Sequence, residues 1–202
     1  MTAPLFRGAA FAVLLLTASS AIAADTNPTA VQAGRYAVET AHTRVQFSVS
    51  HMGFSNWYGD FTGVTGALTL DPKAIAAAKV DITIPVASVS TTNTVLDGEL
   101  RSADWFDAGQ HPTIRFVSTK VVQTAPGKAD ITGDLTFHGV TKPVVLSATF
   151  IGAGENPMSK KYTVGFDATA TLKRSDYGVK TYVPMIGDET TLRISAAFEK
   201  AQ

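Results

Sequence analysis

Apolar and polar residues alternate along much of the chain, and this pattern predicts β-strands. Between Arg44 and His51 the odd-numbered residues are apolar or histidine, and the even-numbered residues are polar or charged. Successive side chains of a strand point to opposite faces, so this stretch predicts a half-buried strand. Residues 53–56 then carry a turn signal before a return strand that starts with the apolar Trp57. Residues 43–61 are therefore expected to form a β-hairpin with one apolar face.

The same alternation recurs through the rest of the chain. A short strand is expected at residues 36–38, and residues 66–70 continue the strand that starts at Trp57. The other alternating segments are residues 80–86, 129–137, 144–150, 162–172 and 192–198. Residues 114–122 are strand-like, but their apolar residues fall on both faces, so the pattern assigns no inner side there. A total of about eight or nine antiparallel strands is typical of a β-sandwich or a closed barrel.

Two segments break the alternation and predict helix. Residues 71–78 place Asp71 before a proline and a run of helix formers, an order typical of an N-cap and a first helical turn. In residues 93–106, Leu96 and Leu100 recur at helical spacing. This spacing predicts a helix or helical loop across one end of the sheet.

The N-terminal residues 1–23 have the pattern of a secretory signal peptide. Arg7 precedes an apolar run, and residues 21–23 (Ala-Ile-Ala) match a small-residue cleavage site. The run is shorter than the roughly 20 residues that a membrane span needs. These features predict an exported, periplasmic protein, with residues 24–34 as a flexible leader and 35–202 as a single β-domain.

Charge and cysteine content exclude several classes of function. Removing residues 1–23 takes away one charge, that of Arg7, so the remainder has one more acidic than basic residue. A domain that neutralises phosphates carries a clear basic excess, so nucleic acid is not an expected partner. The chain contains no cysteine, which excludes disulfides, thiolate metal sites and a cysteine nucleophile.

Periodicity alone leaves open whether the interior is a cavity or a packed core. Eight strands can close into a barrel that side chains fill or that holds one small ligand. Small residues recur on the apolar faces, and they leave room between the large ones or interdigitate with them. They are Ala129, Gly133, Ala148, Ala168, Ala170 and Ala196.

Four motifs follow one another along the chain. They are VQFSVSHMGF at residues 45–54 with GDF at 59–61 and GAL at 66–68, LRSADWFD at 100–107 with PTIRF at 112–116, GDLTFHGVTKP at 133–143, and KRSDYG at 173–178. Together they resemble the YceI-like family of exported, lipocalin-like proteins. The resemblance extends from Tyr36 to Phe198.

This resemblance implies an all-β fold, an eight-stranded antiparallel lipocalin-like barrel with one or two short helices. It also implies an apolar tunnel that takes a polyisoprenoid chain, such as a quinone or prenyl lipid, with no cofactor. Two residues depart from the family pattern, since Glu99 replaces a common histidine and Trp105 a common phenylalanine. The expected ligand-binding residues are Phe47, Val49, His51, Phe54, Trp57, Phe61, Ile82, Ile84, Leu135, Phe137, Phe150, Phe166, Arg174 and Tyr177.

The histidines have two interpretations. His51 continues an inward-facing row, where it would bind a ligand head group at the cavity mouth or be satisfied by a backbone carbonyl at the strand end. His42, His111 and His138 fall in predicted turns or on outward faces. Histidines scattered in this way lack the short spacing of a metal site, and no metal is expected.

Charged residues gather in the predicted helical segment and in a later loop. Asp97, Glu99, Asp104 and Asp107 surround Arg101, which suggests either a paired-carboxylate active site or a salt-bridge network. In the long connection 173–189, Arg174 would bind a ligand head group or pair with Asp176 or another carboxylate. No nucleophile elbow, phosphate loop or zinc-protease motif is present, so no catalytic residue is expected.

The expected function is that of an exported carrier or sequestering protein for an isoprenoid lipid, with transient membrane contact but no membrane span. One alternative is an enzyme that acts on such a lipid, with His51 or the acidic cluster as general acid or base. Another is a ligand-free β-domain that contacts proteins through an exposed apolar patch.

Overall fold

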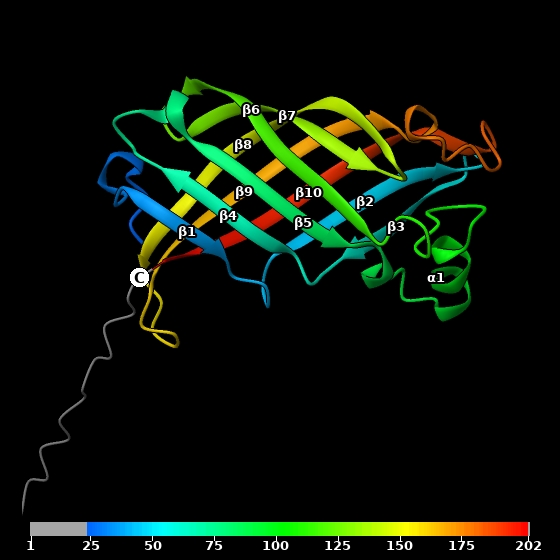
Figure 1. Ribbon diagram of the computed structural model, residues 1–202, viewed down its shortest axis with the longest axis horizontal. Coiled ribbons are helices and arrows are strands. Elements are labelled where there is room, and N and C mark those ends of the chain that lie inside the picture. Colours follow the sequence, from blue (N-terminus) through cyan, green and yellow to red (C-terminus); the bar gives the residue numbers. More distant parts are fainter. Residues whose placement is uncertain (1–23, 202) are drawn as a thin grey trace, which may run out of the picture.

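Ten strand segments form one antiparallel sheet that closes on itself (Figure 1). The computed structural model describes residues 24–201. In sheet order the strands run β1-β4-β5-β6-β7-β8-β9-β10-β2-β3, and an additional pairing of β1 with β10 closes the barrel. The strands are β1 (Gly34–Val38), β2 (Arg44–His51), β3 (Ser55–Phe61), β4 (Thr65–Leu70), β5 (Lys79–Pro85), β6 (Thr113–Ala125), β7 (Lys128–Phe137), β8 (Val140–Glu155), β9 (Tyr162–Lys173) and β10 (Ile186–Lys200).

Two barrel strands are interrupted, so the ten segments fill eight positions. One edge of β10 pairs with β9, and the other edge pairs with β2 along most of its length and with β1 at its end. The next barrel strand is likewise made of two segments, because β3 pairs with β2 and β4 pairs with β1. Thr43 bridges the gap between β1 and β2, because its hydroxyl donates to the Ala197 carbonyl (3.3 Å) and accepts from the Ala197 N–H (3.1 Å). The predicted eight-stranded antiparallel barrel is confirmed.

A register shift in β6 explains why its sequence shows no consistent inner face. Ile114 and Phe116 are buried before the shift at residues 118–120, and Val121 is buried after it. One extra residue in a strand moves the inner face from even to odd positions. Both halves of β6 therefore present apolar side chains to the barrel interior.

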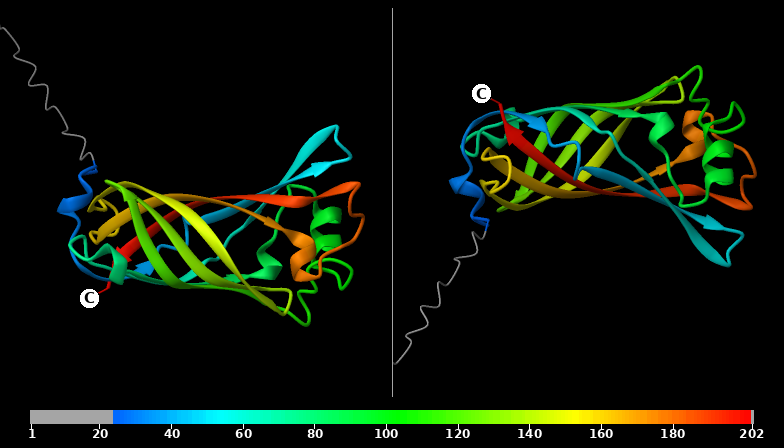
Figure 2. Two further views of the ribbon diagram at one scale, coloured as in Figure 1. Left: turned by 90° about the horizontal axis from the view of Figure 1, so that it is seen from above. Right: turned by 90° about the horizontal axis from the view of Figure 1, so that it is seen from below.

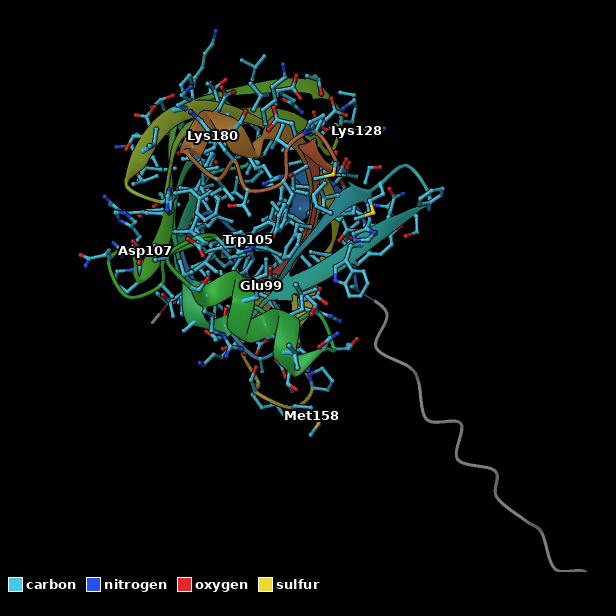
Figure 3. All side chains as sticks on the ribbon, turned by 90° about the vertical axis from the view of Figure 1, so that its right-hand side faces the viewer. Glu99, Trp105, Asp107, Lys128, Met158 and Lys180 are labelled. Carbon is cyan, nitrogen blue, oxygen red and sulfur yellow. The ribbon has the colours of Figure 1, made fainter. Side chains whose placement is uncertain are left out.

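One predicted helix forms at one end of the barrel. Helix α1 (Thr94–Arg101) begins after Asn93, whose side chain accepts hydrogen bonds from the N–H groups of Val95 and Leu96. Leu100 is buried and Leu96 partly buried, as the helical spacing predicts. Figure 3 shows α1 lying across this end of the barrel, which we call the α1 end.

The other predicted helix is reduced to a single 3-10 turn, η2 (Ile75–Ala77). The Asp71 carboxylate accepts from the N–H of Lys73 (2.9 Å), a local turn that replaces the predicted N-cap of an α-helix. The remaining 3-10 turns in the described residues are η1 (Pro28–Ala30), η3 (Val86–Ser88) and η4 (Arg174–Tyr177).

The predicted leader packs against the barrel. Asp25 exchanges two backbone hydrogen bonds with Ala153 of β8 (2.8 and 2.9 Å), and Val31 is buried. Turn η1 lies between them and borders the barrel interior. The predicted signal peptide, residues 1–23, lies outside the described residues. No helix among the described residues is long and apolar enough to cross a membrane.

The β2–β3 hairpin projects from the barrel at the α1 end (Figure 2). Met52 and Phe54, at its tip, are 53% and 90% exposed. The outer edge of β3 pairs with no strand among the described residues, because β5 continues the sheet from β4 and not from β3. A backbone bridge between Asp60 and Ser90 links β3 to the segment that leads into α1.

Candidate ligand-binding cavity

A cavity of ≈ 890 Å³ runs through the barrel interior. Its lining reaches Pro28 and Gly127 near η1 and Trp105 and Met185 at the α1 end, and it is almost wholly apolar. Pockets that bind small molecules occupy roughly 300–1,000 Å³, so this volume is near the upper end of that range. The interior therefore favours the cavity over the packed core, the two arrangements that periodicity leaves open.

A row of small residues in register explains the space. Ala129, Ala148 and Ala168 lie opposite one another on β7, β8 and β9, and all three line the cavity. The same row continues through Ile194 of β10 to Val45 of β2. Three neighbouring methyl groups leave one wall of the barrel without the bulk that would fill it.

All but two of the predicted ligand-binding residues line this cavity. Phe54 is outside it, because the chain turns at the hairpin tip and exposes the ring. Tyr177 is buried behind Phe137, with ring centroids 5.8 Å apart, and does not reach the lining. Ligand contact at any of these positions stays a prediction. The residues that line the cavity are Phe47, Val49, His51, Trp57, Phe61, Ile82, Ile84, Leu135, Phe137, Phe150, Phe166 and Arg174.

Sequence reasoning missed the side chains that loops bring to the α1 end. Trp105 and Phe106 follow α1 in a turn, and Tyr182 and Met185 lie in the connection before β10. Loop residues carry no periodicity, so no pattern marks which of them face inward. The large aromatic side chains in the turn after α1 were the one available signal.

A family model described as a YceI-like domain matches residues 36–198. The chain belongs to the YceI-like family. It is 40% identical over 190 residues to Protein YceI of Escherichia coli O6:H1, a match that covers 93% of each chain. It is 44% identical over 149 residues to a UPF0312 protein of Ectopseudomonas mendocina, covering 73% of this chain and 78% of the relative.

Solved structures share the fold of this YceI-like protein. BcnA of Burkholderia cenocepacia has a TM-score of 0.72 and 26% identity, and the match covers 79% of this chain and 98% of BcnA. A domain of Saccharophagus degradans described as polyisoprenoid-binding has a TM-score of 0.64 and 12% identity, covering 84% of this chain and all of that domain. At 12% identity the second match shows the fold alone.

Glu99 and Trp105 contact each other at the α1 end. The indole N–H of Trp105 donates to Glu99 Oε1 (3.2 Å), and both side chains line the cavity. The guanidinium of Arg174 lies over the Trp105 ring, 5.4 Å from its centroid. This end of the YceI-like cavity therefore carries a carboxylate and an indole that bond to each other.

His51 and Trp57 form a second polar feature at the same end. Both line the cavity, and their ring centroids are 6.2 Å apart. The Trp57 Nε1–H is buried and has no hydrogen-bond partner in the described part of the chain. A buried donor without a partner is uncommon in folded proteins.

Arg174 is buried, and backbone carbonyls occupy its guanidinium. Burial lowers the pKa of Arg174, and the nearby Asp188 carboxylate opposes that shift. Asp176 pairs with Lys142 (3.2 Å) and not with Arg174, and contact of Arg174 with a ligand head group stays a prediction. Its donors instead hold the loop 179–187 against the cavity mouth. The acceptors are the carbonyls of Val179 (3.1 Å), Thr181 (2.9 Å), Ile186 (2.8 Å) and Gly187 (2.9 Å).

Among the salt bridges of the described residues, none involves the acidic cluster of the α1 segment or Arg101. Asp97 accepts from the N–H and the hydroxyl of Thr91 (2.6 and 2.7 Å), and these hydrogen bonds hold the pKa of Asp97 below its ordinary value. Arg101 donates to the Val89 carbonyl (3.1 Å). These two contacts fasten α1 to the segment before it.

Two of the four histidines come together outside the cavity. His111 and His138, 27 positions apart in the chain, have ring centroids 5.0 Å apart. Asp107 lies beside them, and none of the three lines the cavity. His42 instead contacts Glu39 at an exposed turn (2.8 Å).

Proposed function

We propose that this YceI-like protein binds the chain of an isoprenoid lipid, such as a prenyl quinone, inside the barrel and carries or sequesters it. The observation that carries this proposal is the long apolar cavity with its row of alanines. The 15 residues of β10 span about 50 Å along the strand. A strand tilt of about 35–45° leaves roughly 35–40 Å along the barrel axis. An extended apolar chain matches that shape.

The α1 end suits the ligand head group. His51, Glu99 and Trp57 line the cavity there, whereas the central row consists of methyl groups and aliphatic side chains. The quinone head group would lie at this end while the prenyl chain extends along the alanine row. The Saccharophagus degradans domain described as polyisoprenoid-binding supports this ligand class through its fold.

The test is direct identification of the ligand. Protein purified without added lipid is extracted with organic solvent and analysed by mass spectrometry, and stripped protein is titrated with prenyl quinones. We expect an isoprenoid lipid in the extract and saturable binding of one quinone per barrel. An extract without lipid, together with no saturable binding, rules the proposal out.

An enzyme that acts on the same lipid has less support. Within the described lining Glu99 is the one carboxylate, and its Oε1 accepts from Trp105. Acid–base chemistry would then depend on Glu99 or His51. Turnover of a bound prenyl lipid that His51→Ala and Glu99→Gln both abolish would favour the enzyme.

Export to the periplasm belongs to the same proposal. It rests on the signal-peptide pattern of residues 1–23, with its apolar run and Ala-Ile-Ala site. Fractionation of cells that express the full chain should place a protein beginning at Ala24 in the periplasm. Full-length protein in the cytoplasmic fraction would contradict export.

Transient membrane contact would let the lipid enter at the α1 end. Met52, Tyr182 and Met185 are each more than half exposed and also line the cavity, so the apolar lining continues onto the surface. Phe54 extends this surface at the hairpin tip, and a backbone hydrogen bond from Met52 to Met185 (2.8 Å) joins the hairpin to the loop. Exposed apolar side chains around a cavity mouth suit a bilayer surface.

Vesicles of neutral phospholipid that contain prenyl quinone test this contact. Phe54→Ser should slow quinone transfer from the vesicles and leave quinone affinity in detergent unchanged, because Phe54 lies outside the cavity. Tyr58→Ser, an exposed change on the same hairpin, is the control. Equal transfer rates for the wild type and Phe54→Ser would refute membrane contact through this tip.

A further inference from the structure

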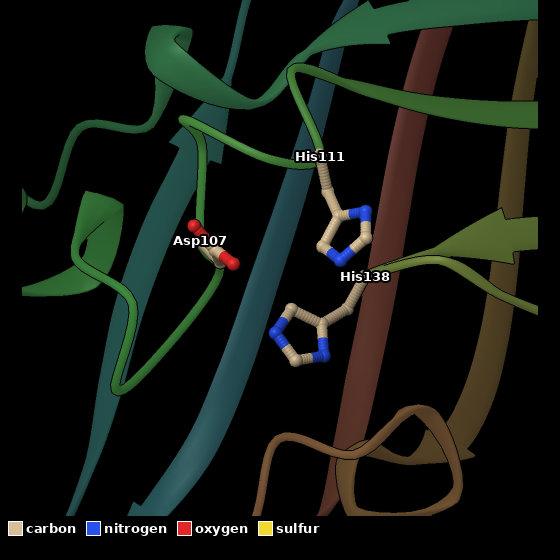
Figure 4. A group of neighbouring side chains, drawn as sticks. All are labelled: Asp107, His111 and His138. Atoms are coloured by element: carbon tan, nitrogen blue, oxygen red, sulfur yellow. The ribbon is translucent and has the colours of Figure 1, made fainter.

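A cluster of two histidines and an aspartate lies near the α1 end and outside the cavity lining (Figure 4). Asp107 follows the turn after α1, His111 precedes β6, and His138 occupies the turn between β7 and β8. One ligand atom from each residue lies within 4.8 Å of the others. The fold thus brings together two nitrogen ligands and one carboxylate from two separate segments.

The hydrogen bonding of His138 leaves one ring nitrogen free to bind a metal. Its Nδ1 lies 2.9 Å from the Tyr177 carbonyl oxygen. A carbonyl can only accept, so Nδ1 carries the proton and Nε2 keeps its lone pair. Histidine ligands of metals almost always donate their second ring N–H to a carbonyl or carboxylate in this way. The outer shell of a metal site is therefore already in place at His138.

The backbone holds the three side chains in close approach at a conformational cost. Asp107 and His138 both have positive φ (46° and 48°), which L-residues seldom adopt. Gly139, which follows His138, leaves space for the His111 ring, because a Cβ at this position would lie only 2.6 Å from that ring. The N–H of His111 donates to the Asp107 carbonyl (2.8 Å), which fixes the loop between them. Strained backbone of this kind clusters at functional sites.

We propose that Asp107, His111 and His138 bind a divalent transition-metal ion, with Zn²⁺ as the best match. Zn²⁺ takes imidazole nitrogen and carboxylate oxygen at about 2.0–2.2 Å, and three protein ligands leave a fourth position for water. Ligand atoms around one ion then lie roughly 3.3 Å apart. Closing the cluster from 4.8 Å to that separation needs side-chain rotations that shift these atoms by about an ångström.

The ion would join parts of the α1 end that the chain connects only at a distance. Asp107 directly follows Trp105 and Phe106, which line the cavity, and His138 is tied through Tyr177 to turn η4. Binding that is specific to the native state stabilises the fold. The site is therefore a structural clamp between the α1 segment and the β7–β8 turn, and it does not depend on the proposed lipid function.

Calorimetric titration of untagged, chelator-treated protein with Zn²⁺ tests the site. We expect one ion per chain and a rise in Tm on addition of Zn²⁺. Asp107→Asn, His111→Gln and His138→Asn should each weaken binding at least about 100-fold, since even outer-shell changes cost about 10- to 100-fold. Asparagine is used at positions 107 and 138 because it tolerates positive φ.

Matched controls separate the cluster from other ligands on the surface. His42→Gln and Asp104→Asn remove a histidine and an aspartate elsewhere, and both should leave affinity unchanged. Electron paramagnetic resonance of the Cu²⁺ form should show coupling to two imidazole nitrogens, and to one in His111→Gln. If His138→Asn unfolds through loss of the Tyr177 contact, the affinities of Asp107→Asn and His111→Gln for Zn²⁺ decide whether the cluster binds the ion. Wild-type affinity in these two variants, or loss of binding in His42→Gln, overturns the proposal.

Discussion

Replacing Ala168 by phenylalanine places an aromatic ring in the middle of the proposed tunnel. Ala168 lines the cavity and lies opposite Ala148 on one side and Ile194 on the other. Its neighbour Thr169 is exposed and points outward from the same strand. Ala168→Phe and Thr169→Phe therefore add the same side chain to the inside and to the outside of one barrel wall.

Ala168→Phe should maintain or raise the stability of the fold but lower the affinity for long prenyl chains. In a packed interior an added ring would cost about 1–3 kcal/mol through overpacking. A cavity of ≈ 890 Å³ has room for the ring, and burying it there contributes up to about 1.5–3 kcal/mol. The same ring blocks the path of an isoprenoid chain. A prenyl unit has about five carbons, so excluding one loses up to about 4 kcal/mol. That loss is roughly a thousandfold in Kd.

Urea unfolding and quinone titration measure the two quantities. Ala168→Phe should unfold at the same or higher urea concentration as the wild type and bind long prenyl quinones much more weakly than short ones. Thr169→Phe should bind all chain lengths like the wild type. The reasoning is refuted if Ala168→Phe is destabilised by more than about 1 kcal/mol, which indicates a packed core. It is also refuted if affinity for long quinones is unchanged.

Three further changes test the framework around the cavity. Arg174→Met leaves several buried carbonyls without a donor and should lower the free energy of unfolding by at least about 3 kcal/mol. The control Arg193→Met changes an exposed arginine and should alter the free energy of unfolding by less than about 0.5 kcal/mol. Equal losses for the two variants in urea unfolding would contradict the role of Arg174 in holding the loop. Gly133→Ala puts a Cβ 2.6 Å from a backbone carbonyl oxygen and should lower the free energy of unfolding by about 1–3 kcal/mol. Gly98→Ala adds a Cβ with nothing within 4 Å and should stabilise α1 by about 0.5–1 kcal/mol. Thermal unfolding should therefore show a lower Tm for Gly133→Ala and a higher Tm for Gly98→Ala than for the wild type. Burial raises the pKa of Asp188, but two hydrogen bonds and neighbouring positive charges lower it by more, to below its ordinary value of 3.8. A depressed folded pKa contributes stability that is present above the ordinary value and is lost as pH falls through the folded value. Asp188→Asn should therefore flatten the loss of stability in acid, and an unchanged acid profile would show that Asp188 does not contribute.

The period of two along the chain was sufficient to predict an antiparallel β-fold and most of its inward faces. It places Phe47, Val49 and Phe61 on the lining because the side-chain direction in a strand is set by position alone. Helical spacing likewise predicted that Leu96 and Leu100 of α1 face the barrel. The motifs around these residues carried the resemblance to the YceI-like family, which the comparison over residues 36–198 confirms.

The tertiary structure decided what a local pattern cannot express. The bulge in β6 reverses the inner face after residue 118, and a strand sequence does not show which partner residue is skipped. Loops place Trp105 at the cavity mouth and occupy the Arg174 guanidinium with carbonyls, because the contacts of irregular segments depend on what packs beside them.

Closure and long-range contact are the other two properties that needed three dimensions. Alternation is the same in a sandwich and in a barrel, and only the pairing of β1 with β10 shows that the sheet closes around a cavity. His111 and His138 are distant in the chain, and the pairing of β6 with β7 brings the loops beside them together. Sequence spacing measures separation along the chain, whereas a binding site depends on separation in space.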